Sequence, residues 1–415
     1  MSFWIHAASA RRPDRIAVEG PERRLTYAEL AAAVTAKARV LAADGVAAGD
    51  RYPLPFEDPC EYVVTLHACV GLGAAVVPID LRLSAAERAA RAVAGRVVFP
   101  GTVAVLHTSG TTSAPKPVEL SAANFLASAL GSAVALGLDL DERWLCPMPL
   151  THVGGLSIPI RSVIYGTTGV LHGRFDTEAV LAELMNHERR ITIVSLVPTM
   201  LARLLDAGLQ RPPTLRWALL GGGPIAPALL ARAEAAGVPV APTYGMTEAC
   251  SQIATFGWPL PGVDVTLSAA EEIFVRGPIV SPGSVDDDGW LHTGDLGELD
   301  DLDRLRIIGR KADTIVTGGE NVAPAEVEAA LLEHPDVVDA GVFARPDPEW
   351  GEAIVATIVA RPGASPTADA LGEFVGARLA RFKVPKAFEF ATELPRTASG
   401  KLLRRQLADV GAARP

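Results

Sequence analysis

Cysteine is scarce in this chain, with four residues among 415. Their spacing matches no zinc or iron–sulfur motif, and they stand far apart as Cys60, Cys69, Cys146 and Cys250. Scattered cysteines in a chain of this size argue against a disulfide-stapled secreted domain. We therefore expect a reduced, cytoplasmic protein.

Long apolar runs are also missing. The longest, roughly residues 70–79, is interrupted by Gly71, Gly73 and Pro78 and is too short to cross a bilayer. The first residues show no basic start before an apolar core, so the sequence predicts no signal peptide and no membrane span.

An excess of positive charge is absent as well. Lys and Arg number 38 against 48 Asp and Glu, which gives a formal net charge of −10. This balance argues against nucleic acid or an anionic membrane as the main partner. A hydrophobic content of 49% with 21% charged residues is typical of a globular protein, and the length allows two or more domains.

Strand and helix patterns alternate along most of the chain. Thr26 followed by Glu29 forms a capping box at the start of a predicted helix, and Gly73 to Pro78 is a predicted buried strand. This alternation predicts a large, layered α/β domain over 1–310. Residues 311–415 predict a small α+β domain, with strands near 337–344 and 353–360.

The most informative stretch is 103–121. An apolar strand, Val103 to Leu106, precedes five hydroxyl side chains in six positions, 108–113, and Ser121 is a predicted helix N-cap. Hydroxyls, freed backbone N–H groups and one ammonium are groups that bind phosphates. The alternative is an ordinary polar hairpin, and the position between a strand and a helix favours phosphate binding. The phosphate-binding candidates are Thr108, Ser109, Gly110, Thr111, Thr112 and Lys116.

This loop is not a Walker motif, because Lys116 lies between Pro115 and Pro117. It resembles the phosphate loop of the adenylate-forming superfamily, which contains acyl-CoA synthetases, luciferases and peptide-synthetase adenylation domains. The usual pattern is T-S-G-T-T-G-x-P-K-G, and here Ser113 and Pro117 replace two glycines.

Further motifs of that superfamily follow in the same order, and each alone could be an ordinary turn or strand end. The first is a P-x-x-H-x-x-G element in the stretch 147–157, whose Pro and Gly content predicts irregular backbone. The others are three glycines at 221–223, Y-G-x-T-E at 244–248, T-G-D at 293–295, a Gly-Arg pair at 309–310, and P-R-T-x-x-G-K at 395–401.

The resemblance implies the fold of an adenylate-forming enzyme, whose small C-terminal domain is mobile, together with ATP, Mg²⁺ and coenzyme A as cofactors and substrates. It also implies roles for particular residues: Tyr244 and Gly222 at adenine, Thr247 at the α-phosphate, Glu248 at Mg²⁺, Asp295 and Arg310 at the ribose, His152 beside the reacting carboxylate, Lys401 bridging carboxylate and α-phosphate, Gly318 and Gly319 in a coenzyme A tunnel, and a hinge at Ala312.

Four local segments resemble, more narrowly, the o-succinylbenzoate–CoA ligases of menaquinone biosynthesis. These segments are 155–158, 161–166, 219–224 and 244–253. The acyl-contact candidates are His152, Arg161, Ser195, Gly221 and Gly245, of which Arg161 is argued only from its charge. The short segment between Leu81 and Val103 also suits that family.

Three functions therefore remain in view. The first is an AMP-forming o-succinylbenzoate–CoA ligase, and the second is another aryl- or fatty-acyl-CoA ligase of the same fold. The third is a carboxylate-binding protein that has lost catalysis, which Ser113, Pro117 and Ala312 would favour. A carrier-loading adenylation domain is disfavoured because no carrier domain follows before Pro415. Whether the chain forms a homodimer is left open.

Overall fold

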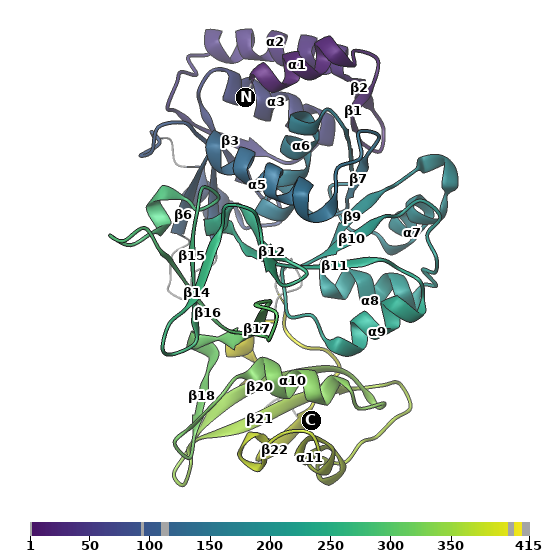
Figure 1. Cartoon of the computed structure of the whole chain (residues 1–415), viewed down its shortest axis with the longest axis vertical. Helices are drawn as coiled ribbons and strands as arrows, with labels where there is room; N and C mark the ends of the chain where they lie inside the picture. Colours follow the sequence, from purple (N-terminus) through teal and green to yellow (C-terminus); the bar gives the residue numbers. More distant parts are fainter. Residues whose placement is uncertain (1, 93–94, 109–115, 397–401, 409–415) are drawn as a thin grey trace. The chain divides into compact units, whose positions relative to one another are not determined.

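The computed structural model describes residues 2–92, 95–108, 116–396 and 402–408. The chain forms two compact units (Figure 1). Unit 1 comprises 1–222, 233–265 and 275–292, and unit 2 comprises 223–232, 266–274 and 293–415. The predicted domain boundary between residues 310 and 311 stays a prediction.

Unit 1 is built on a nine-stranded sheet in the order β13-β12-β11-β10-β9-β7-β8-β1-β2. Its central strands, from β11 to β1, are parallel, while β12, β13 and β2 are antiparallel additions at the edges. The strands are β1 (Ile16–Glu19), β2 (Arg24–Thr26), β7 (Arg143–Cys146), β8 (Thr168–Leu171), β9 (Ile193–Leu196), β10 (Trp217–Leu220), β11 (Val240–Met246), β12 (Ser251–Thr255) and β13 (Trp258–Pro259).

A second sheet of unit 1 has the order β3-β4-β5-β6. Its strands are β3 (Arg51–Pro55), β4 (Ala75–Ile79), β5 (Thr102–Thr108) and β6 (Lys116–Ser121), and only the last pair is antiparallel. Parallel sheets are normally covered by helices on both faces, so their strands are almost wholly apolar. All five residues of β4 are buried, as that rule requires.

The helices of unit 1 cover these sheets (Figure 1). They are α1 (Ser2–Arg11), α2 (Tyr27–Ala43), α3 (Pro59–Gly71), α4 (Ala85–Arg91), α5 (Ala122–Leu136), α6 (Val153–Tyr165), α7 (Thr177–Met185) and α8 (Pro198–Asp206). The predicted capping box of Thr26 and Glu29 opens α2, and Ser121 with Asn124 forms another at α5. Helix α5 packs against α6, and the two helices bury polar side chains, among them Ser128, Ser132 and Arg161.

The stretch 147–157 differs from its prediction. Its Pro and Gly content predicted irregular backbone throughout, yet α6 begins at Val153, with His152 as its N-cap. A Cβ at Gly155 would overlap the carbonyl oxygen of Pro149, so the glycine serves close packing of the first helical turn against the preceding loop.

Unit 2 contains a five-stranded sheet, β19-β18-β21-β20 with β22 paired to β21. Its strands are β18 (Ile315–Thr317), β19 (Glu320–Val322), β20 (Val337–Asp347), β21 (Gly351–Ala360) and β22 (Ala387–Phe390), and its helices are α10 (Pro324–Leu332) and α11 (Ala368–Gly376). Val327 and Leu331 of α10 pack into one core with Val342, Ile354 and Leu371. This is the predicted α+β arrangement.

Four further strands and one further α-helix are found in the described part of the chain. They are β14 (Asp264–Leu267), β15 (Glu272–Arg276), β16 (Leu291–Leu299), β17 (Leu305–Arg310) and α9 (Pro227–Ala235). Of these, β17 lies wholly in unit 2, and it pairs antiparallel with the part of β16 that follows Gly294. No helix in the described part of the chain is long and apolar enough to cross a membrane.

Candidate active site

The strands that flank the predicted phosphate loop form a hairpin. Thr108 ends β5 and lies opposite Lys116, the first residue of β6, and the Thr108 hydroxyl lies 3.5 Å from the Lys116 carbonyl oxygen. Ser109, Gly110, Thr111 and Thr112, together with Ser113, fall outside the described residues. The order along the chain is strand, loop, strand and helix, so the expected strand–loop–helix order omitted β6, while Ser121 caps α5 as predicted.

Other predicted residues lie at the carboxyl ends of two neighbouring parallel strands, β10 and β11. Gly221 and Gly222 come directly after β10, and Tyr244 lies near the end of β11, which is its hydrogen-bonded neighbour. In open α/β sheets, ligands bind in the crevice beyond these strand ends. The topology therefore brings these three residues to one edge of the sheet.

Gly245 allows β11 to approach the start of β12 very closely. A Cβ at this position would overlap the carbonyl oxygen of Ser251, and the strand register shifts between Tyr244 and Gly245. The close approach of these two backbone segments therefore requires glycine at position 245, whether or not Gly245 also contacts an acyl group.

Thr247 and Glu248 lie on a single 3₁₀ turn, Thr247–Ala249, between β11 and β12. The Cys250 N–H donates to the Thr247 carbonyl oxygen at 3.0 Å and closes the turn. Within the described residues, no hydrogen bond or ion pair engages the half-buried Glu248 carboxylate. Mg²⁺ in nucleotide sites commonly takes one or two carboxylates and completes its shell with phosphates and water, so Glu248 fits that ion.

His152 occupies the N-cap of α6, and its side chain does not cap the helix. His152 is exposed to solvent, yet neighbouring protein lowers its pKa by desolvation, and the Arg82 guanidinium adds to that shift. Arg82 itself is paired with Asp80, whose carboxylate lies 2.6 Å from the nearer guanidinium nitrogen. A neutral imidazole is therefore favoured at this position.

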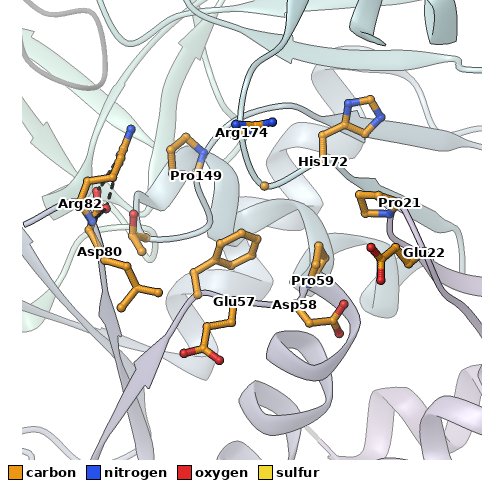
Figure 2. A pocket seen from close by; sticks show the side chains of 14 residues that line it. Pro21, Glu22, Glu57, Asp58, Pro59, Asp80, Arg82, Pro149, His172 and Arg174 are labelled. Atoms are coloured by element: carbon orange, nitrogen blue, oxygen red, sulfur yellow. Dashed lines mark hydrogen bonds and ion pairs between the residues drawn. The ribbon is translucent and has the colours of Figure 1, made fainter.

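A cleft of about 520 Å³ lies in unit 1, with Asp80, Arg82, Pro149 and His172 among the residues that line it (Figure 2). The cleft is lined by residues that directly follow three strands: Phe56 after β3, Asp80 after β4 and His172 after β8. Thr151, the neighbour of His152, lines it, whereas no residue predicted for the site does so. Sequence reasoning gave no role to Asp80 and Arg82, which line this cleft and whose charges act on His152.

Ser195 and Arg161, two of the predicted acyl-contact residues, are 3% and 1% exposed. The Ser195 hydroxyl accepts a hydrogen bond from the Trp144 indole N–H at 2.9 Å, and Arg161 Nη2 donates to the Ser128 hydroxyl at 2.8 Å. Both side chains are therefore engaged by protein. Their contact with an acyl group stays a prediction.

In unit 2 the predicted ribose residues form an ion pair. Asp295 of β16 lies directly opposite Arg310 of β17, and Arg310 Nε is 2.8 Å from Asp295 Oδ1. The Glu272 carboxylate bonds to a chain neighbour of each partner: it accepts hydrogen bonds from the N–H of Gly294, which precedes Asp295, at 3.2 Å and from the ammonium of Lys311, which follows Arg310, at 2.8 Å. The Asp295 carboxylate is buried and Arg310 is partly exposed.

Gly318 and Gly319 form the two-residue connection of the β18–β19 hairpin, with φ values of 58° and 86°. Such a turn needs residues that tolerate positive φ, which explains the glycine pair without reference to a ligand. Lys401 lies outside the described residues. The segment after it is anchored by Arg404, which donates to Asp313 at 3.0 Å and to Glu328 at 2.6 Å.

Two family models match the chain. One, described as AMP-binding enzyme, matches residues 5–99 and 101–283, and the other, AMP-binding enzyme C-terminal domain, matches 326–401. The chain therefore belongs to the AMP-binding enzyme family, and the resemblance to adenylate-forming enzymes is confirmed.

Among curated relatives, the 2-succinylbenzoate–CoA ligase of Bacillus licheniformis is 37% identical and covers 97% of this chain and 98% of its own length. That of Geobacillus kaustophilus is 38% identical, with 98% and 97% covered. These matches confirm the expectation of an AMP-forming acid–thiol ligase.

Solved structures give the same result. The Bacillus subtilis o-succinylbenzoate CoA synthetase with its acyl-adenylate intermediate superposes with a TM-score of 0.87 at 35% identity, covering 97% of each chain. The same enzyme with ATP and magnesium ion also gives 0.87 at 35% identity, covering 98% of this chain and 99% of the other. The predicted α/β fold class is thereby confirmed.

Proposed function

We propose that this protein is an o-succinylbenzoate–CoA ligase that consumes ATP and releases AMP and pyrophosphate. The observation that carries this proposal is the full-length match to the Bacillus subtilis synthetase, whose solved complex contains the acyl-adenylate of o-succinylbenzoate. Glu248 and the Thr108–Lys116 hairpin supply a carboxylate and a phosphate-loop frame that suit the same reaction.

The reaction has two displacements. In the first, an oxygen of the acid attacks the α-phosphorus of ATP, and the bond from that phosphorus to the pyrophosphate oxygen breaks. In the second, the thiol sulfur of coenzyme A attacks the acyl carbon, the thiol proton is lost to solvent, and AMP leaves. Both steps depend on orientation and on neutralised phosphate charge more than on covalent help from the protein.

Particular residues would serve the first step. Thr247 would donate to an α-phosphate oxygen, Glu248 would hold Mg²⁺, and Lys401 would bridge the carboxylate and the α-phosphate. Bound Mg²⁺ supplies charge neutralisation on the phosphates. In its favoured neutral form, His152 would orient the acid by hydrogen bonding and contact, without adding a charge.

Unit 2 would contribute nucleotide and thiol contacts. The Asp295 carboxylate accepts the ribose hydroxyls beside Arg310, with which it is already aligned. The hairpin at Gly318 and Gly319 would line the path of the pantetheine arm.

A second candidate, another aryl- or fatty-acyl-CoA ligase, is favoured by one observation. A substrate with a second carboxylate needs a donor for it, and Ser195 and Arg161 are both buried and bonded within the protein. Because both side chains are engaged by protein, this arrangement suits a substrate with a single carboxylate.

The test is a substrate panel with ATP, Mg²⁺ and coenzyme A, measuring AMP release and thioester formation. We expect o-succinylbenzoate to be used at least tenfold more efficiently than benzoate or octanoate, since an unpaired polar site rejects ligands that lack its partner. Clear activity on benzoate or octanoate with none on o-succinylbenzoate would contradict the proposal. Lys401→Ala should reduce pyrophosphate release by on the order of 10²-fold while preformed acyl-adenylate still reacts with coenzyme A.

A further inference from the structure

The turn that carries Thr247 and Glu248 ends in strained backbone. Cys250 has φ 50° and Ser251 has φ 93°, two successive non-glycine residues with positive φ. Such conformations cost on the order of 1–3 kcal/mol each and persist only where the surroundings enforce them. The structure shows two anchors that enforce this one.

The first anchor is the hydroxyl of Ser128, a buried residue of α5. It donates to the Cys250 carbonyl oxygen at 2.8 Å and accepts from Arg161 Nη2 at 2.8 Å. Because a guanidinium can only donate, the single hydroxyl proton of Ser128 is left to point at Cys250. Arg161 thereby fixes the direction of the Ser128 hydrogen bond.

Arg161 is an unusual residue for this position. It is 1% exposed, no carboxylate pairs with it in the described part of the chain, and its Nε has no partner there. Its guanidinium carbon lies 5.7 Å from the centre of the Trp144 ring, which offsets part of the desolvation. Burying an unpaired charge is costly, so packing alone does not explain an arginine here.

The second anchor is Ser281. Its N–H donates to the Glu248 carbonyl oxygen at 2.8 Å, and its hydroxyl donates to the Glu119 carbonyl oxygen at 2.8 Å. Glu119 belongs to β6, the strand that starts at Lys116. The turn with Glu248 is thus tied to the strand that follows the phosphate loop.

We infer that Ser128, directed by Arg161, is a positioning residue for Thr247 and Glu248. It holds the strained end of their turn, and so fixes the carboxylate that would bind Mg²⁺ and the hydroxyl that would meet the α-phosphate. This inference rests on the proposed adenylation chemistry. It gives Arg161 a role that needs no contact with the acyl substrate.

The experiment compares Ser128→Ala with Ser132→Ala. Ser132 is a matched control, because it is equally buried at 1%, lies one turn along α5, and has no hydrogen bond to the Thr247–Ala249 turn among the described residues. For each variant we would measure pyrophosphate release against Mg²⁺ concentration, the KM for o-succinylbenzoate, and MgATP affinity by calorimetry without acid.

For Ser128→Ala we expect about a tenfold lower rate and a several-fold higher Mg²⁺ concentration at half-maximal rate, with KM for the acid unchanged. Ser132→Ala should match the wild type in all three measurements. Equal Mg²⁺ dependence in the two variants overturns the inference. A wild type that binds MgATP but ignores o-succinylbenzoate refutes the proposed substrate instead, and the calorimetric comparison of Ser128→Ala with Ser132→Ala still decides the positioning role.

Arg161→Met keeps the test valid should Ser128→Ala unfold. Replacing a buried charge by an apolar side chain is often neutral or stabilising, so the melting temperature should not fall. A weaker MgATP affinity and a shifted Mg²⁺ dependence in this variant support positioning. An increased KM for o-succinylbenzoate, with unchanged KM for benzoate and unchanged Mg²⁺ dependence, would instead make Arg161 a substrate contact and overturn its positioning role.

Discussion

The two units hold their candidate residues by different means. In unit 2, Asp295 and Arg310 meet because they are register partners on adjacent antiparallel strands. In unit 1, Thr247 and Glu248 depend on a strained turn whose carbonyls are held by Ser128 and Ser281, residues remote in sequence. Local strand pairing is a robust way to place a pair of side chains, whereas the turn requires several distant segments to be packed correctly.

The largest expected effect comes from a matched pair of glycine substitutions, one in each unit. Gly245→Ala should reduce adenylation by on the order of 10²-fold, because the new Cβ overlaps the Ser251 carbonyl and displaces the turn with Glu248. Gly294 has φ 68° and open space around its Cβ position, so Gly294→Ala should cost only about 1 kcal/mol of backbone strain. The measurements are pyrophosphate release and thermal unfolding.

The comparison between the units would fail if Gly294→Ala impaired adenylation as severely as Gly245→Ala. It would also fail if Gly245→Ala retained wild-type rates, since the close approach would then have no bearing on Glu248.

The sequence predicted the residues that lie in contiguous motifs. Asp295 follows directly from T-G-D, and β5 follows from the apolar run Val103 to Leu106, whereas β6, which pairs with β5, was not predicted. Ser128 could not be found in this way. It is a small residue inside an apolar helix, and its partner is a backbone carbonyl 122 positions away, which has no signature in the sequence.

The helix α6 was missed for a related reason. Local glycine and proline content predicted irregular backbone over 147–157, but tertiary packing of Gly155 against Pro149 favours helix from Val153 onward. Likewise, Arg161 is recognisable as a cation in the sequence, and only the structure shows that it faces Ser128.

A smaller effect is expected in unit 2 from the Asp295–Arg310 pair. Asp295→Ala and Arg310→Ala should each raise the KM for ATP about tenfold, and the double variant should lose less than the product of the two, because the residues share one interaction. Arg306→Ala is the control. Arg306 lies on the same strand, is exposed, and pairs with Glu298 on β16 as Arg310 does with Asp295.

An effect of Arg306→Ala on the KM for ATP as large as that of Arg310→Ala would show that the strand ladder, and not the ribose contact, is being perturbed. Independent, multiplicative effects of Asp295→Ala and Arg310→Ala would mean that the aligned pair does not act together.

The smallest effect concerns stability, and it again separates the units. His67 of α3 is 1% exposed, with no partner for either ring nitrogen in the described residues, and burial lowers its pKa to about 3. Unfolded histidine binds a proton below about pH 6.5, while folded His67 stays neutral. The unfolded state therefore binds more protons between these values, and unit 1 should lose stability as the pH falls from about 6.5, with a contribution from His67 of up to about 1.4 kcal/mol per pH unit.

His67→Leu removes this contribution and fills the same apolar site. Native-state hydrogen exchange of α3 amides, converted to opening free energies between pH 6.5 and 5, should therefore show a flatter pH dependence in the variant than in the wild type. Amides of β20 and β21 in unit 2 are the internal control, because their opening should not change with this substitution. An unchanged slope in α3 would mean that His67 is protonated inside the fold, and the buried imidazole would then need a partner that accepts its charge.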